Sequence, residues 1–467
     1  MKILLSHGYF LEDDPKEKEI MRPYPPLGIL YLSAFLKRKN ITAEVYDTTF
    51  STKEAFKAYL LQNRPPFIGL YVNLMTKINI VEIMKFIRSE ERLKHTRIIL
   101  GGPEVRYHDE AFLRAGADYI VLGEGETTLY DLLTTVDSAF SPFLDTIDGI
   151  AFINMKGEVV RTKERAKMKD IDVLPFPDRE AIDLNKYFKA WKGKHGMSAA
   201  SVSTMRGCPY TCKWCSRAVY GLSYRRRSPK LVVEELAWIQ KNYDVDTFWF
   251  VDDVFTVSHK WLTTFAEEVK LAGITIKYEC ITRADRMNDE VITLLQESGC
   301  FRVWIGAESG SQRILDAMDR RVETTKVQEM IQKSQAVGVA AGTFIMLGYP
   351  GETEEDIQET VDHLIACDPD KFTITVAYPI KGTAMYAEVE SSMIMDSKWE
   401  TRTDRDIDFE RTYPRKYYDY AVRWVVNSVN AAQQKKRGEW LNSLKSGLKA
   451  RVAKSGMRRN RKKPQNA

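Results

Sequence analysis

The chain has 467 residues, of which 44% are hydrophobic and 28% charged, as in an ordinary globular protein. This length exceeds what a single hydrophobic core usually serves, so two or three domains are expected. Six cysteines in so long a chain exclude a disulfide framework, and three of them lie within the eight residues 208–215. This distribution favours a reducing, cytoplasmic location and one thiolate site.

The formal net charge of +5 is unevenly distributed. Residues 435–467 hold twelve Lys or Arg and one acid, a net +11 that leaves −6 on the rest of the chain. Acids at positions 12–14 follow the first apolar run too soon for a signal peptide, and the longest uncharged run, 334–351, contains four glycines and a proline. We therefore expect neither a signal peptide nor a membrane span.

Residues 1–140 alternate short apolar runs with helical patterns. The expected strands are Ile3–Ser6, Ala43–Tyr46, Phe67–Val72, Arg97–Leu100 and Tyr119–Leu122. This α/β alternation predicts a parallel, doubly wound (Rossmann-like) sheet, which binds ligands at the carboxyl ends of its strands. Two of those ends are rich in glycine, at Gly101-Gly102 and at Gly123-Glu124-Gly125-Glu126. Residues 141–195 lack the alternation and read as a connector with one hairpin, Gly149–Asn154 and Gly157–Arg161.

Alternation resumes over residues 196–390 with a longer period. The expected strands are Ala200–Thr204, Thr247–Val251, Thr275–Cys280, Arg302–Ala307, Gly342–Met346 and Phe372–Val376. Helix starts are predicted at Ser228-Pro229, Asn288 and Thr353, the last with Asp356 as a capping box. Six βα units predict a partial (β/α)6 barrel, with its active site at the carboxyl ends of the strands.

Residues 391–467 form the last predicted segment, helical and ending in the basic tail. Apolar residues recur on one helical face at Trp440, Leu441, Leu444, Leu448 and Val452. A basic amphipathic helix of this kind can lie on an anionic membrane surface, which predicts a peripheral membrane location. Three other interpretations stay open: docking on the barrel, a disordered solubilising end, and weak nonspecific attraction to nucleic acid. A specific nucleic-acid partner is not expected.

The strongest motif directly follows the first barrel strand. Cys208, Cys212 and Cys215 are spaced Cys-x3-Cys-x2-Cys in a loop that Gly207 and Pro209 keep from forming a helix. Three thiolates in a flexible loop suit iron–sulfur ligation, with one iron left without a protein thiolate. The alternatives are zinc, which prefers four ligands in structural sites, and inert thiols.

Polar residues follow the other barrel strands. They are Asp252 and Asp253, Glu279 with Arg283, Glu308, and the run Gly348–Glu352. A polar ring at the active end of a barrel fits a small charged cofactor.

The cysteine loop, with Trp214 before its last cysteine, resembles the cluster signature of radical S-adenosylmethionine (SAM) enzymes. The resemblance extends through Phe250–Asp253, Cys280–Arg283, Gly299–Val303, Gly306–Ser311 and Tyr349–Thr353. With the N-terminal domain, it covers about residues 1–390. It is similar to the cobalamin-binding branch, in particular the anaerobic magnesium-protoporphyrin monomethyl ester oxidative cyclase group.

The resemblance implies that the three cysteines hold a [4Fe–4S] cluster whose unique iron chelates SAM. One-electron reduction, by a flavodoxin- or ferredoxin-like donor, would give a 5′-deoxyadenosyl radical that abstracts a substrate hydrogen. By position, the residues implied for SAM are Tyr210, Trp214 at the adenine, Asp252 at the amino group, and Arg283 and Glu308 at the carboxylate or ribose. The alternative role of these charged residues is to close the barrel mouth as salt bridges.

The resemblance also implies cobalamin, though without a histidine ligand to cobalt. The pattern Asp-x-His-x-x-Gly is absent, and His7, His95 and His108 have other neighbours. The implied contacts are Tyr24, Pro26, Gly28 and Thr76 at the lower face, and Gly101, Gly102, Gly123, Glu124, Gly125 and Glu126 along the nucleotide tail. The alternative role of these glycines is to form tight packing turns.

The function that the resemblance implies is a cobalamin-dependent radical SAM enzyme acting at an unactivated carbon of a small molecule. Methyl transfer is the first hypothesis. Oxidative cyclisation or another rearrangement, on a hydrophobic or pigment-like substrate, is the second. A non-catalytic iron–sulfur or cobalamin sensor is the alternative from a different class.

Overall fold

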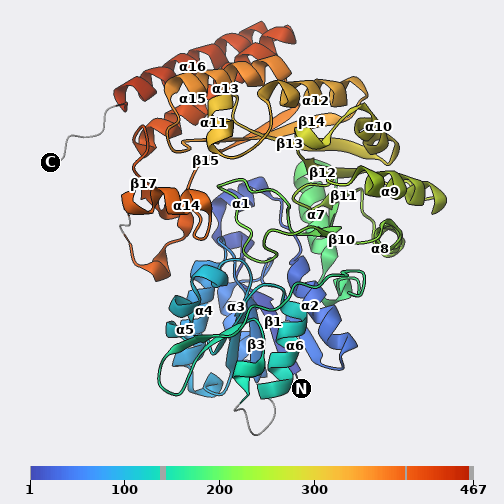
Figure 1. The fold of residues 1–467 in the computed structure, drawn as a ribbon, viewed down its shortest axis with the longest axis vertical. Coiled ribbons are helices and arrows are strands. Elements are labelled where there is room, and N and C mark those ends of the chain that lie inside the picture. Colours follow the sequence, from blue (N-terminus) through green and yellow to red (C-terminus); the bar gives the residue numbers. More distant parts are fainter. Residues whose placement is uncertain (1, 137–142, 395–396, 462–467) are drawn as a thin grey trace, which may run out of the picture. The chain divides into compact units, whose positions relative to one another are not determined.

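The computed structural model describes residues 2–136, 143–394 and 397–461 (Figure 1). It divides into two compact units, each assembled from stretches that are separate in the sequence. Unit 1 comprises Met1–Pro209, Ser216–Thr247 and Ser397–Asp404. Unit 2 comprises Tyr210–Cys215, Phe248–Asp396 and Arg405–Ala467.

Unit 1 contains a seven-stranded sheet in the order β2-β1-β3-β4-β5-β6-β7. The first five strands are parallel: β1 Lys2–His7, β2 Thr42–Tyr46, β3 Phe67–Tyr71, β4 Arg97–Gly101 and β5 Tyr119–Val121. The predicted hairpin forms as β6 Ile150–Ile153 and β7 Val159–Arg161 and extends this sheet in antiparallel fashion. The second half of the predicted connector holds a helix, α7 Leu184–His195.

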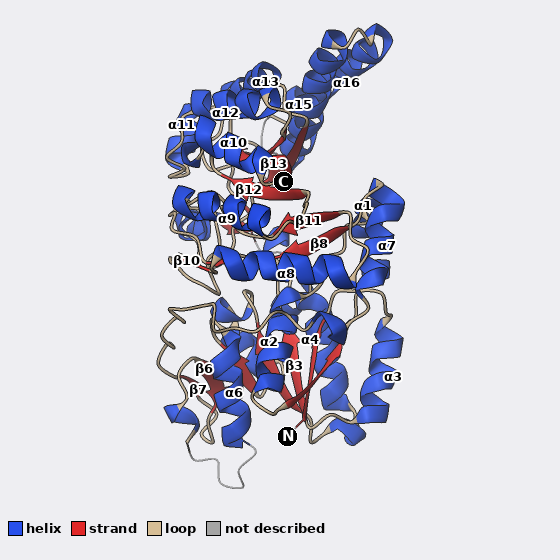
Figure 2. Ribbon diagram, turned by 90° about the vertical axis from the view of Figure 1, so that its right-hand side faces the viewer, coloured by secondary structure: helices blue, strands red, loops and turns tan. Residues whose placement is uncertain are grey.

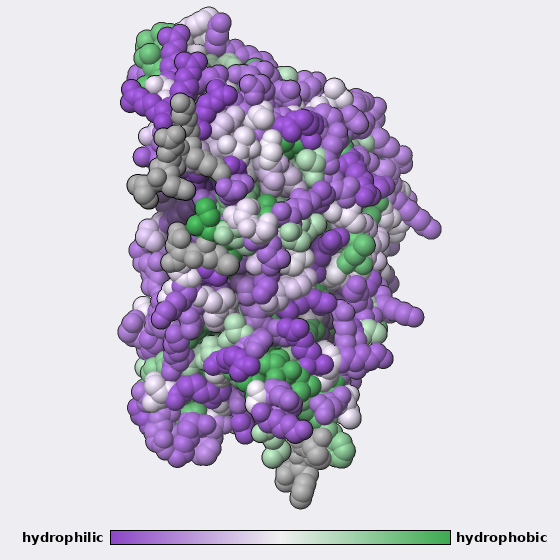
Figure 3. Space-filling view, turned by 60° about the vertical axis from the view of Figure 1, so that its left-hand side comes forward, coloured by the Kyte–Doolittle hydropathy of each residue, from purple (hydrophilic) through white to green (hydrophobic). Residues whose placement is uncertain are grey.

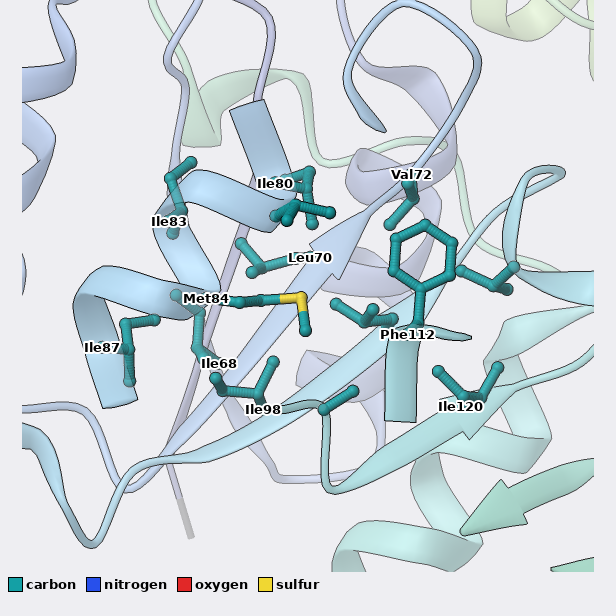
Figure 4. Close-up of a cluster of buried hydrophobic side chains, with 14 of the residues drawn as sticks. Ile68, Leu70, Val72, Ile80, Ile83, Met84, Ile87, Ile98, Phe112 and Ile120 are labelled. Carbon is teal, nitrogen blue, oxygen red and sulfur yellow. The ribbon is translucent and has the colours of Figure 1, made fainter. Parts of the chain in front are cut away.

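Helices lie against both faces of this sheet (Figure 2). They are α2 Leu27–Arg38, α3 Lys53–Asn63, α4 Lys77–Ser89, α5 Asp109–Arg114 and α6 Gly125–Val136. On one face Ile68 and Leu70 of β3 pack with Met84 of α4 and Phe112 of α5 (Figure 4). A second core cluster contains Leu5 of β1 together with residues of α2 and α6. Successive residues of a strand point to opposite faces of the sheet, so each face has its own core with helices over it. The doubly wound α/β fold expected from the alternation is confirmed.

The second sheet has the order β15-β14-β13-β12-β11-β8. Its strands are β8 Ala199–Val202, β11 Thr247–Phe250, β12 Tyr278–Thr282, β13 Cys300–Glu308, β14 Ala340–Leu347 and β15 Lys371–Val376. The helices between them are α8 Pro229–Asn242, α9 His259–Leu271, α10 Asp289–Glu297, α11 Gln312–Ala317, α12 Thr324–Ala336 and α13 Glu354–Cys367. Six strands linked through helices give the partial barrel that the alternation predicts.

Local sequence signals account for the helix boundaries, while one predicted strand is displaced. The Asn288 side chain accepts the Val291 N–H at 2.8 Å, and Thr353 and Asp356 form the predicted capping box. The strand predicted over Thr275–Cys280 is displaced toward the C-terminus, since β12 begins at Tyr278 and ends at Thr282. Pairing with β13 begins only at Tyr278 opposite Cys300, because the neighbouring chain is still turning at Gly299, where φ is +97°.

The C-terminal part of unit 2 contains α14 Ala384–Val389, the short pair β16 Met393–Ile394 and β17 Asp408–Phe409, and two long helices. The long helices are α15 Arg415–Lys436 and α16 Trp440–Arg459, which pack on each other. Among the described residues, no helix combines the length and apolar character needed to cross a membrane.

Candidate cofactor site

In unit 1 a two-stranded pair frames the cysteine loop. β9 Met205–Arg206 and β10 Arg225–Arg226 are antiparallel, and the chain between them carries the three cysteines. Gly207 opens the loop at a φ of +85°, and a Cβ there would lie 2.6 Å from the Ser223 carbonyl oxygen. A side chain at this position would clash with Ser223, so the tight entry to the loop requires glycine. Cys208, the next residue, is half-buried.

In unit 2 the segment with the other two cysteines is fastened by backbone hydrogen bonds. The Lys213 N–H donates to the Met318 carbonyl at 3.1 Å, and the Lys213 carbonyl accepts the Met385 N–H at 2.9 Å. The Cys215 N–H donates to the Cys212 carbonyl at 3.3 Å, forming a turn. Cys212 is buried and Cys215 is exposed.

Two arginines surround the Cys212 sulfur. Arg283 Nη1 lies 3.5 Å from Cys212 Sγ, and Arg320 Nη1 lies 3.9 Å from the same atom. The Arg283 guanidinium also stacks over the Tyr210 ring at 3.9 Å and donates to the Arg320 carbonyl at 2.6 Å. Guanidinium donors stabilise a thiolate or a negatively charged cluster, so these surroundings fit the predicted iron–sulfur site.

Three predicted residues, Tyr210, Cys212 and Arg283, therefore meet in unit 2. Arg320 was missed by sequence reasoning, since it belongs to no motif. Only the structure marks this residue: in the short segment after α11 both of its neighbours, Asp319 and Arg321, have positive φ, at 52° and 54°. This backbone aims Arg320 inward, where its Nη2 donates to the Gly306 carbonyl at 2.7 Å.

Glu308 ends β13 in a strained conformation. Its φ is +65°, which for a residue other than glycine costs about 1–3 kcal/mol and is most frequent at functional sites. The register of β13 with β14 also shifts between Gly306 and Glu308. Burial raises the pKa of the Glu308 carboxyl, and the nearby Arg320 and Arg283 partly oppose this shift.

The remaining two residues predicted for SAM are also in unit 2. Asp252 is buried two residues after the end of β11. Trp214 is half-buried and packs against a core cluster that includes Met318 and Tyr349. These contacts give the indole a packing role of its own. Its contact with adenine stays a prediction.

In unit 1 the two acids after β5 hold the arginines that flank the cysteine loop. Arg206 contacts Glu126 and lies 3.0 Å from Glu124, and Arg225 lies 2.7 Å from the second oxygen of Glu124. Burial raises the pKa of the Glu124 carboxyl, but Arg206 and Arg225 lower it by more, so the carboxylate is ionised. Glu124 and Glu126 were expected along a cofactor tail; the structure shows them ion-paired within unit 1.

The other residues predicted for cobalamin lie in the segments that follow β1, β3, β4 and β5 in the chain, or at the end of β4 itself. Tyr24 is exposed and packs edge-on against Trp191, and Pro26 and Gly28 begin α2. Thr76 accepts the Asn73 N–H at 3.0 Å. A Cβ at Gly102 would lie 2.4 Å from the Val72 carbonyl oxygen, so tight packing alone requires this glycine.

A buried polar cluster follows β4 and includes a segment distant in sequence. Glu104 and Asp404 each lie 3.8 Å from His108 Nε2. The Trp399 indole N–H donates to His108 Nδ1 at 3.2 Å, so Nδ1 carries no proton and Nε2 carries one. These three groups lie close enough together for a metal ion, but a protonated Nε2 cannot be a metal ligand. The Lys77 ammonium, 4.4 Å from the Trp399 ring, completes the cluster.

This cluster predicts a pH-dependent stability. Burial and the charge of Asp404 raise the pKa of the Glu104 carboxyl from 4.5 to about 7. An unfolded chain loses this proton near pH 4.5, so the stabilisation is complete below that pH and declines as the pH rises to about 7, by on the order of 3 kcal/mol. Urea unfolding of the wild type from pH 4.5 to 7.5 measures the decline. Glu104→Gln should flatten the profile, and an unchanged profile would contradict the assignment to Glu104.

Comparison with known proteins identifies both parts of the chain. A model of the radical SAM superfamily matches residues 202–364, and a model of the B12 binding domain matches residues 19–133. An uncharacterised methyltransferase of Pyrococcus horikoshii is 26% identical over 391 residues, covering 82% of each chain. The anaerobic magnesium-protoporphyrin IX monomethyl ester cyclase of Rubrivivax gelatinosus is 27% identical, over 79% of this chain and 66% of its own.

A solved structure has a similar fold. The radical SAM methyltransferase TsrM of Kitasatospora setae, solved with cobalamin and a [4Fe–4S] cluster bound, aligns over 97% of this chain and 99% of its own, with a TM-score of 0.72 and 15% identity. The resemblance stated from the sequence is thus confirmed, as are the cofactors it implied: a [4Fe–4S] cluster, SAM and cobalamin. Such chemistry needs a reductant and a small-molecule substrate. The chain therefore carries a B12-binding domain followed by a radical SAM domain, the combination found in cobalamin-dependent radical SAM enzymes.

Proposed function

We propose that this protein is a cobalamin-dependent radical SAM methyltransferase acting at an unactivated carbon. The observation that carries the proposal is the joint presence of the B12-binding domain and a cysteine loop in which Arg283 and Arg320 donate to Cys212. The likeness to a methyltransferase over 82% of the chain supports methyl transfer. The likeness to a cyclase keeps oxidative cyclisation as the second candidate.

Each cofactor has proposed contacts in this chain. Cys208, Cys212 and Cys215 would hold the cluster. Tyr210, Trp214, Asp252, Arg283 and Glu308 would contact SAM. The cobalamin contacts would be Tyr24, Pro26, Gly28, Thr76, Gly101, Gly102 and Gly123–Glu126. We propose domain limits of 1–140, 141–195, 196–390 and 391–467.

When bound, the cluster with SAM supplies a radical that removes a hydrogen atom, and cobalamin supplies the methyl group. The protein's own side chains do the positioning. Arg283 and Arg320 would balance negative charge at Cys212, and the buried carboxyl of Glu308, held by a strained backbone, would present a fixed acceptor.

Product analysis tests the proposal. The anaerobically reconstituted protein is incubated with SAM, cobalamin and a strong reductant. Both 5′-deoxyadenosine and S-adenosylhomocysteine, the product left when SAM gives up its methyl group, are expected. Formation of 5′-deoxyadenosine alone would favour cyclisation. Neither product from protein with a full cluster would overturn the enzyme assignment and favour a sensor.

The cobalamin is predicted to bind base-off and with no nitrogen ligand to cobalt from the protein. His7, at the end of β1, is engaged by Asp47 through Nε2 at 3.0 Å and by Thr48 through Nδ1 at 3.1 Å, and His95 is exposed ahead of β4, away from the ligand end. The Co(II) electron paramagnetic resonance spectrum should lack nitrogen splitting. A nitrogen-split spectrum that persists in His7→Ala and His108→Ala would show that the base of the cofactor itself coordinates.

Three further partners are also proposed. The reductant would be a flavodoxin- or ferredoxin-like one-electron donor, as the superfamily chemistry requires. The substrate would be hydrophobic. The basic C-terminal segment would attach the protein peripherally to an anionic membrane, and the structure of α16 bears on this attachment.

A further inference from the structure

Helix α16 packs on α15 through its small and polar residues. The buried positions of α16 are Ser446, Ala450, Ala453 and Met457. Ser443 Oγ donates to the Ala431 carbonyl at 2.8 Å, and Ser446 Oγ lies 2.9 Å from Gln434 Oε1. At Gly456 the backbone lies directly against the Tyr420 ring, where a Cβ would come within 2.4 Å. The face that holds α16 in place is therefore not its apolar one.

The large apolar residues of α16 face solvent. They are 60–76% exposed: Trp440, Leu444, Leu448 and Val452 recur every four residues along the helix, and Leu441 lies beside the first of them. We call these five residues the α16 stripe. Single exposed apolar residues are ordinary, but a continuous row of five usually marks a binding surface. In Figure 3 hydrophobic residues reach the surface among hydrophilic ones at the top of the view, at the height of α16 in Figure 1.

The charge beside the stripe is of a single sign. From Trp440 to Arg459 the helix contains six Lys or Arg and no acid: Lys445, Lys449, Arg451, Lys454, Arg458 and Arg459. Lys454 also covers the Trp424 ring of α15 at 4.2 Å, so part of this charge is already fixed in place. Pairing two copies of the chain through their stripes would bring two basic rows together. An anionic surface would neutralise them instead.

We propose that α16 is an interfacial helix that docks the protein on an anionic lipid bilayer. The α16 stripe would enter the boundary between headgroups and acyl chains, while the lysines and arginines beside it contact the anionic headgroups. The inference is independent of the radical chemistry, since α16 lies outside the cysteine loop and the residues proposed to contact SAM. It selects the membrane interpretation over docking of the apolar face on the barrel.

Vesicle sedimentation of the full chain tests this inference. The protein should pellet with phosphatidylcholine vesicles containing 30% phosphatidylglycerol, pellet far less with pure phosphatidylcholine, and be released by high salt. Leu444→Ser with Leu448→Ser removes apolar area without changing charge, and should weaken partitioning by at least about tenfold. The matched control replaces two exposed residues elsewhere, Leu271 and Met155, by serine and should bind like the wild type.

Three outcomes would overturn the proposal. They are equal pelleting with neutral and anionic vesicles, equal binding by the stripe variant and the control, and no pelleting of any form. If light scattering instead shows a dimer that the stripe variant abolishes, the stripe is a self-association surface. A fluorescence readout adds a local test: Trp440, 62% exposed, should shift its emission to the blue on vesicle binding, a change absent in Trp440→Phe.

Discussion

Replacing Cys208, Cys212 or Cys215 singly by alanine should leave the reconstituted protein almost without iron and unable to cleave SAM. All three are needed because a [4Fe–4S] cluster with one iron reserved for SAM has three protein thiolates, and no other cysteine lies in the loop. Iron content and the 400 nm absorbance of each variant measure the loss. We expect a fall from about four irons per chain to background.

Cys367 provides the matched control. It ends α13, and burial raises the pKa of its thiol to about 12, so it stays protonated and is a poor metal ligand. Cys367→Ala should keep a full cluster. A Cys212→Ala protein with full iron would refute the ligand assignment, whereas loss of iron in both variants would indicate damage to the fold.

Glu235→Ala should destabilise the protein by about 3–5 kcal/mol, the largest effect expected of a single substitution away from the cofactor site. Glu235 of α8 is fully buried between Arg179, 2.7 Å away, and Arg227. Both arginines also donate to carbonyls near β8, those of Ser201 and Ser203. Removing the carboxylate leaves two buried cations without a counter-charge. The shift in the urea unfolding transition measures the effect.

The exposed neighbour Glu234 supplies the control, since Glu234→Ala should change stability by no more than about 0.5 kcal/mol. Burial raises the pKa of the Glu235 carboxyl, but Arg227 and Arg179 lower it by more. Its contribution should therefore be complete above about pH 4.5 and be lost as the pH falls through the lower folded value. Equal stability of Glu234→Ala and Glu235→Ala would contradict the network.

Local signals in the sequence predict much of the fold because they act over a few residues. Asn288 and Thr353 cap helices where their side chains reach the first free N–H groups, and the cysteine spacing marks the loop that follows β8 and β9. Strand ends can be read from apolar runs, except where a partner delays pairing, as Gly299 delays β12. The family follows from the same short motifs.

Contacts between distant segments could not be predicted in this way. No pattern in the sequence couples Arg320 to Cys212, or Glu124 to Arg206 and Arg225, because each pair depends on how loops from separate strands meet. The apolar periodicity of α16 is visible in the sequence, but the sequence does not show whether the apolar face packs on the protein or faces solvent. One alternative was that the hydrophobic row docks the helix on the barrel. In the structure the residues of the other face, most of them small, make the packing contacts instead.

The return of Ser397–Asp404 to unit 1 has a consequence for biosynthesis. Trp399 and Asp404 reach His108 and the Lys77 ammonium only after nearly three hundred further residues have been made. On the ribosome, the B12-binding domain must therefore wait with a buried-charge cluster half assembled while the barrel emerges. Messages truncated before codon 397 should yield a domain with a raised tendency to be captured by chaperones, and pausing within the barrel would prolong that interval.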